Sequence, residues 1–113
     1  PEHPRTLTVR ANLAYWIGKA GEAAVARDLF GELLPIRTEV SGARHPDTLM
    51  VRANFAYWTG KAGRPDLARD EYRDLLPVME EVLGPEHPDT LTGRGRLAGW
   101  IGKAGEAAVA RDK

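Results

Sequence analysis

The sequence predicts an all-α protein made of stacked helical repeats, an α-solenoid. The dipeptide His-Pro returns every 42 residues, beginning at His3. Residues 3–44 and 45–86 are identical at 24 of 42 aligned positions, and the segment 16–28 returns unchanged at 100–112. No segment shows the sustained alternation of apolar and polar residues that indicates a strand. A fixed period of this length is typical of supersecondary units that bury their apolar faces on one another.

The period divides the chain into two full units and a shorter third one. The units span residues 3–44, 45–86 and 87–113, and we expect them to form one domain over residues 1–113. We expect five to six antiparallel helices wound into a short right-handed superhelix. The third unit should turn at Gly105 and begin a second helix that stops eight residues later, as if cut from a longer array.

The second unit shows why each repeat should form a pair of helices. Pro46 and Asp47 follow His45, which suits a helix start because proline lacks an N–H and the carboxylate faces the positive end of the helix dipole. Apolar residues then recur at helical spacing as far as Gly60. Gly63 can adopt the left-handed conformation that ends many helices. We therefore predict that the first helix of the pair lies between these signals.

The second helix of this unit begins at Pro65 and ends before Gly84, because its apolar residues continue with a period near 3.6. Pro77, like Pro35 in the first unit, falls inside this helix. An interior proline loses a hydrogen bond and costs ~3 kcal/mol in a straight helix. We expect a kink rather than a break, because the apolar stripe continues beyond Pro77.

The amino-acid composition argues against several classes of partner. Sixteen basic and 16 acidic residues give a formal net charge of +0, so no overall field attracts nucleic acid or an anionic membrane. No apolar run approaches the ~20 residues that span a bilayer, and no signal-peptide pattern opens the chain. Cysteine is absent, which removes disulfide and thiolate chemistry. We expect a cytoplasmic protein without nucleic-acid or membrane partners.

No motif points to a cofactor, a metal or catalysis. The stretch from Gly93 to Ala98 matches the glycine pattern of dinucleotide sites, but no strand precedes it. The three histidines occur once per unit, which separates them by ~10 Å or more and prevents them from sharing one metal ion. We expect the histidines to act at helix starts. No acid–base pair or activated nucleophile is evident, so we predict a protein that is not an enzyme.

The three tryptophans stand at the same position of each unit. Aromatic residues at helical spacing usually pack in a core, so we expect Trp16, Trp58 and Trp100 to occupy equivalent environments between helices; the alternative is partial exposure on a binding surface. Small residues should lie where two helices approach closely, because protein interiors are tightly packed. The residues expected there are Ala14, Ala26, Ala56 and Ala68.

The helix pairs resemble tetratricopeptide repeats. In the first unit, Leu13-Ala14-x-x-Ile17, Gly21 and Ala26-x-x-x-Phe30 fit the family's pattern. The period of 42 and the phrase G-P-E-H-P-D-T-L, which begins at Gly84, are similar to the long-helix variety found in kinesin light chains and in bacterial arrays attached to NB-ARC-type signalling ATPases. This resemblance implies an α-solenoid with a concave groove lined by the first helix of each pair. The second unit has matching residues at Phe55, Ala56, Gly63, Ala68 and Tyr72.

The resemblance also implies a binding site. In the family, an asparagine on the first helix hydrogen-bonds the backbone of a bound peptide, and Asn12 and Asn54 stand at that position. A carboxamide suits this role because it both donates and accepts. The alternative is that the asparagines face solvent or bridge neighbouring helices. The third unit departs from the pattern: Gly93, Gly95 and Gly99 indicate either a loosened terminal unit or a surface that admits another backbone closely. The other implied groove residues are Thr8, Tyr15, Lys19, Met50, Tyr57, Lys61, Arg96 and Lys103.

We therefore predict a protein–protein interaction module that holds a peptide or partner segment along the groove, as part of a larger signalling or scaffold protein. The basic groove residues favour an acidic segment or a free carboxylate. A second hypothesis is a self-assembling structural unit that oligomerises through its uncapped C-terminal end, by two-fold pairing or head-to-tail stacking. The residues expected to be poorly covered at that end are Leu97, Trp100, Ile101 and Val109.

Overall fold

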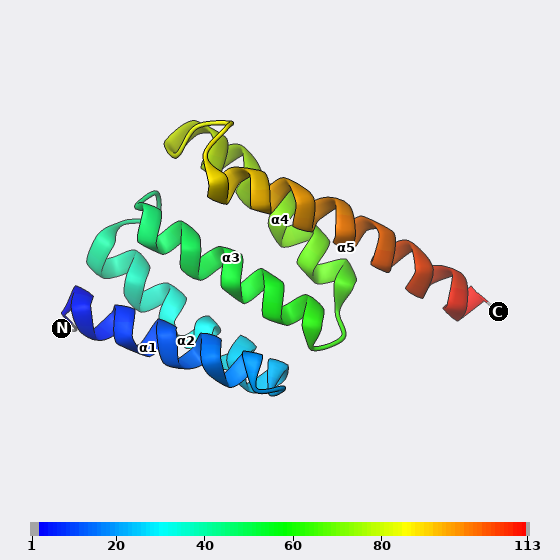
Figure 1. Ribbon diagram of the computed structural model, residues 1–113, viewed down its shortest axis with the longest axis horizontal. Coiled ribbons are helices and arrows are strands. Elements are labelled where there is room, and N and C mark those ends of the chain that lie inside the picture. Colours follow the sequence, from blue (N-terminus) through cyan, green and yellow to red (C-terminus); the bar gives the residue numbers. More distant parts are fainter. Residues whose placement is uncertain (1–2, 113) are drawn as a thin grey trace.

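The computed structural model describes residues 3–112, which form five helices and no strand (Figure 1). Each helix packs chiefly against its neighbours along the chain, so the molecule is a row of helix pairs. Figure 1 shows α1, α3 and α5 running in the same direction along successive layers. The predicted all-α solenoid is confirmed. The helices are α1 (Pro4–Lys19), α2 (Ala23–Ser41), α3 (Pro46–Lys61), α4 (Pro65–Val82) and α5 (Pro88–Asp112).

A histidine caps the start of each first helix. The backbone N–H of Asp47 donates to Nδ1 of His45 at 3.0 Å. The imidazole thereby satisfies one of the N–H groups that a helix leaves unpaired at its start, and the proline that follows needs no such partner. The expectation that the histidines act at helix starts is confirmed. Equivalent bonds join Arg5 to His3 at 3.0 Å and Asp89 to His87 at 3.1 Å.

The turn inside each full unit depends on a glycine. Gly21 and Gly63 have φ angles of +103° and +107°, a left-handed conformation that a side chain would strain. The second helices α2 and α4 then continue through Pro35 and Pro77 without a break. Neither helix breaks at its proline, as expected, so the later apolar residues of each helix stay on the face that covers its partner.

The three tryptophans do not share one environment, although the helices repeat at the expected spacing. Helices α1 and α3 begin and end 42 residues apart. The exposed fraction is 2% for Trp58 and 7% for Trp100, but 65% for Trp16. The expectation of equivalent rings is therefore wrong for Trp16. The reason is that each ring packs on the preceding unit, and no described unit precedes α1.

The buried tryptophans pack directly on glycine backbone. A Cβ atom added to Gly18 would lie 2.6 Å from the Trp58 ring, and one added to Gly60 would lie 2.5 Å from the Trp100 ring. Real Cβ atoms do not approach other atoms so closely, so only glycine allows this contact. Both indole Nε1 atoms are buried without a hydrogen-bond partner among the described residues. Packing alone holds these rings in place.

The core runs continuously from one unit into the next. One cluster joins Leu7, Phe30 and Leu33 of the first unit to Val51 and Trp58 of the second. Two further clusters connect α3 and α4 with each other and with α5. The prediction of small residues at close helix contacts is confirmed, because all four side chains are fully buried. They are Ala14, Ala26, Ala56 and Ala68.

The third unit differs from the expectation. Residues 100–112 belong to one continuous helix, α5, whereas the identical residues 16–28 form a helix end, a turn and a second helix. The expected turn at Gly105 is absent. In the first unit the second helix continues to Phe30 and Leu33, which are buried in the core. Among the described residues, no apolar pair equivalent to Phe30 and Leu33 follows Gly105, so a turn there gains no such packing and the helical hydrogen bonds continue.

Tyr72 ties α4 to α3. Its hydroxyl donates to the carbonyl oxygen of Ala53 at 2.9 Å, and its ring is buried. Burial raises the pKa of the Tyr72 hydroxyl above its usual value, and the nearby guanidinium of Arg96 opposes part of this rise. The neutral phenol is thus the form that the folded state favours.

Two glycine substitutions should have opposite effects on stability. Gly60→Ala should lower the free energy of unfolding by about 1–3 kcal/mol, because the new Cβ overlaps the Trp100 ring. Gly102→Ala should raise it by up to about 1 kcal/mol, because nothing lies within 4 Å and alanine favours a helix. Urea denaturation measures both changes. Equal effects of the two substitutions would contradict the proposed packing.

Stability should fall at alkaline pH through Tyr72. Because the folded-state pKa is raised, the contribution of the neutral hydroxyl is complete below the unfolded pKa of about 10 and is lost as pH rises toward the folded value. An ultraviolet absorbance titration of the three tyrosines should show one that ionises last. Tyr72→Phe should remove this last step; if the step survives, another tyrosine is the shifted one.

Candidate functional site

Three hollows follow one another along the first helices and together form the groove discussed below. The first lies between α1, α2 and α3 and has a volume of about 210 Å³; the second and third reach α5 and have volumes of about 220 and 210 Å³. Tyr15, Met50 and Asn54 line both the first and the second hollow, and Arg96 lines both the second and the third. Because adjacent hollows share walls, the three form one continuous surface.

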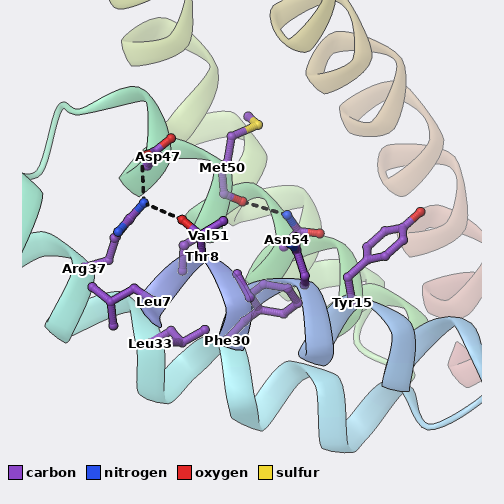
Figure 2. A pocket seen from close by; sticks show the side chains of 12 residues that line it. Leu7, Thr8, Tyr15, Phe30, Leu33, Arg37, Asp47, Met50, Val51 and Asn54 are labelled. Atoms are coloured by element: carbon purple, nitrogen blue, oxygen red, sulfur yellow. Dashed lines mark hydrogen bonds and ion pairs between the residues drawn. The ribbon is translucent and has the colours of Figure 1, made fainter. Parts of the chain in front are cut away.

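The first hollow is held together by a buried arginine (Figure 2). The Arg37 guanidinium is paired with the Asp47 carboxylate at 2.7 Å. It also donates to the carbonyl oxygen of Pro4 at 3.1 Å and to the Thr8 hydroxyl at 3.4 Å. A buried charge is stable only with such partners. The arginine therefore links α1, α2 and the start of α3, and little of its charge remains for a ligand.

The two asparagines lie in the first hollow, one on each of two neighbouring first helices. The Asn12 side chain is exposed, and no hydrogen bond joins it to another of the described residues. Asn54 is half-buried, and its Nδ2 donates to the carbonyl oxygen of Met50 at 3.0 Å, as Figure 2 shows. The Oδ1 atom of Asn54 keeps its capacity to accept. Neither asparagine is buried against a second helix.

The second hollow has a different chemical character. Met79 stands at the position that Arg37 occupies one unit earlier, so the hollow has a thioether where the first has a charge. Thr92 occupies the place equivalent to Thr8 and also lines the hollow. Asp89 and Arg96 supply one charge of each sign. Compared with the first hollow, the second is thus more apolar on the side of Met79, and its charged residues lie on the side of α5.

The third hollow is basic and aromatic. Tyr57, Lys61 and Lys103 line it together with Arg96, and no lining residue carries a carboxylate. The Arg96 guanidinium lies 4.0 Å from the centre of the Tyr57 ring, a cation–π contact. This contact fixes a positive charge at the boundary between the second and third hollows. Positive charge accordingly increases along the groove toward α5.

The structure brings nearly all of the expected groove residues together. Lys19 lines none of the three hollows; it is exposed, with its Nζ atom 6.0 Å from the centre of the Tyr15 ring. Sequence reasoning missed Arg37, because a buried arginine is recognisable only from partners that the fold assembles. It also missed Asp47 and Asp89, which lie at helix starts 42 residues apart, a repetition that could have indicated them. The expected residues found in hollows are Thr8, Asn12, Tyr15, Met50, Asn54, Tyr57, Lys61, Arg96 and Lys103.

The surface expected to be poorly covered at the C-terminal end needs correction. Trp100 is buried, because its ring packs on Gly60 of the preceding unit. Leu97 is half-buried beside it in the same cluster. Ile101 and Val109 are exposed, as expected. The uncovered apolar surface at this end is therefore smaller than predicted.

The described residues also limit other kinds of site. Within residues 3–112, no group of three or more histidine, aspartate or glutamate side chains is arranged to hold a metal ion. None of the five described helices has the length and apolar character that crossing a membrane requires.

Comparisons with known proteins agree with the repeat architecture. The family model for the tetratricopeptide repeat matches residues 4–81. A Podosopora anserina protein assigned as a kinesin light chain, with nearly identical TPR-like repeats, has a similar fold, with a TM-score of 0.82 and 23% sequence identity. A single-substitution variant of that protein gives a TM-score of 0.81 at 23% identity. Both alignments cover 94% of this chain and 50% of the other.

This chain therefore spans about half the length of those structures, and the likeness to them is one of fold. No curated protein is similar enough to match. The family model covers most of the chain, from the start of α1 almost to the end of α4. The chain belongs to the tetratricopeptide repeat family.

Proposed function

We propose that this chain is a protein–protein interaction module that binds an extended peptide along the groove. Tetratricopeptide repeats generally mediate protein–protein interactions. The observation that supports binding of an extended peptide is the pair of carboxamides, Asn12 and Asn54, which lie on neighbouring first helices and line one hollow. Each amide can pair with a peptide group without reading the side chain. Two of them in register favour a ligand with a regular, extended backbone.

The hollows provide places for the side chains of such a peptide. Each of the three has a volume of about 210–220 Å³, and their lining changes from one to the next. In the first, Arg37 is neutralised by Asp47, so uncharged side chains fit there best. In the third, Lys61 and Lys103 lie near Arg96 without a carboxylate. An acidic residue or a free carboxylate would therefore bind toward α5, and charge complementarity would set the direction of the peptide.

The proposal extends to the organisation of the chain. We propose that residues 1–113 act as one domain with units at 3–44, 45–86 and 87–113; the first two residues and Lys113 lie outside the described part. We also propose that the chain has no catalytic role and needs no cofactor, and that it serves a larger signalling or scaffold protein. The support for this is the family, whose repeats are interaction scaffolds.

Removal of either carboxamide should weaken peptide binding. A selection from a random peptide library on the immobilised chain should yield sequences rich in aspartate and glutamate at one end. Asn12→Ala and Asn54→Ala should each weaken the binding of a selected peptide by about 0.5–1.5 kcal/mol, because one amide–backbone hydrogen bond is lost. This corresponds to roughly a two- to tenfold rise in Kd by calorimetric titration.

The control variant is Glu32→Ala, an exposed position on α2 that lines none of the hollows. It should bind the peptide as the parent chain does. Circular dichroism should show that all three variants remain folded. If both asparagine variants bind like the control, the groove is not where the peptide binds.

A further inference from the structure

The outer face of α1 is an exposed copy of a surface that is buried elsewhere in the molecule. Val9, Leu13 and Trp16 have exposed fractions of 62%, 61% and 65%. The equivalent residues of α3 are Val51, Phe55 and Trp58, and they pack into the core shared with the preceding unit. The α1 face thus has the chemistry of an inter-unit contact, and none of the described residues covers it. We call Val9, Leu13 and Trp16 the head.

The opposite end of the molecule has the matching half of this contact. Gly102 of α5 is equivalent to Gly18 and Gly60, each of which receives a tryptophan ring. Nothing lies within 4 Å of a Cβ added to Gly102, so its receiving site is open. Ala98 of the same helix is exposed, whereas its equivalents Ala14 and Ala56 are fully buried in the clusters that hold Trp58 and Trp100. We call Ala98 and Gly102 the tail.

We propose that two copies of this chain associate head to tail, with the Trp16 ring of one copy packed on Gly102 of the other. Such a contact would continue the two that exist inside the chain, where the rings of Trp58 and Trp100 each pack on a glycine 40 residues earlier. The head on α1 and the tail on α5 thus provide the two surfaces that a third such contact needs. Pairing of two heads would instead place ring against ring, with no glycine to receive either.

The geometry of this contact has two consequences. A head-to-tail contact is heterologous, so it can add further copies without closing. It is also weaker than the contacts within the chain, because in these the second helix of a pair packs extensively on the next unit, whereas the tail belongs to α5 alone. Association should therefore become visible only at high protein concentration. Trp16 and Gly102 line none of the three hollows, so the groove stays free.

Complementary variants test the contact. Trp16→Ala removes the ring and leaves the tail intact, and Gly102→Leu fills the receiving site and leaves the head intact. In sedimentation velocity, the mass of the parent should rise with concentration, and each variant alone should associate at least about tenfold more weakly, as expected when an aromatic anchor is lost or blocked. An equimolar mixture should form a 1:1 dimer and no larger species, since only one intact contact is possible.

The control is Val25→Ala, which shortens an apolar side chain on α2 that is exposed but outside the head. It should associate like the parent, and circular dichroism should show that every variant is folded. A parent that stays monomeric at high micromolar concentration would overturn the proposal. So would a Gly102→Leu chain that associates like the parent, which would indicate pairing of two heads, or a mixture that forms no dimer.

Discussion

The contact between a tryptophan ring and the backbone of a glycine one unit earlier determines how the units stack. Trp58 on Gly18 and Trp100 on Gly60 bring successive first helices closer than any side chain at the glycine would permit. Their buried Nε1 atoms have no hydrogen-bond partner in the described part of the chain, so shape and burial alone fix the contact. Interiors packed at near-crystalline density tolerate little change at such a point. The same packing constraint, a ring on a glycine, therefore recurs with the 42-residue period of the sequence.

The groove follows from this constraint. Because the first helices are held at a repeated spacing and register, residues of α1 face residues of α3, and residues of α3 face residues of α5, across similar hollows. The differences between the hollows come from single positions. Arg37 links two units through Asp47, whereas Met79 at the equivalent place leaves Asp89 without a guanidinium partner among the described ion pairs. The scaffold thus repeats, and the chemistry that a ligand would meet changes from one hollow to the next.

The sequence allowed the helices, the histidine caps and the buried alanines to be predicted, because each follows from local residues and a repeated period. It did not allow the exposure of Trp16 or the continuous helix of the third unit to be predicted. Trp16 is exposed although its sequence surroundings resemble those of Trp58, since burial depends on a neighbouring unit. Residues 16–28 and 100–112 are identical yet adopt different structures. In the first unit a turn allows Phe30 and Leu33 to be buried in the core, whereas no equivalent residues follow in the described part of the third unit. Of the candidate site, repetition indicated the asparagines, but the buried Arg37 depends on partners brought together by folding.

The exchange of the indole N–H protons with deuterium tests the central contact most directly. In dilute solution, nuclear magnetic resonance should show three indole signals, one for each tryptophan, assigned by single Trp→Phe substitutions. We predict slow exchange at Trp58 and Trp100, whose Nε1 atoms are buried, and rapid exchange at Trp16, which is exposed. Exchange at Trp58 or Trp100 as fast as at Trp16 would contradict the packing of these rings on glycine.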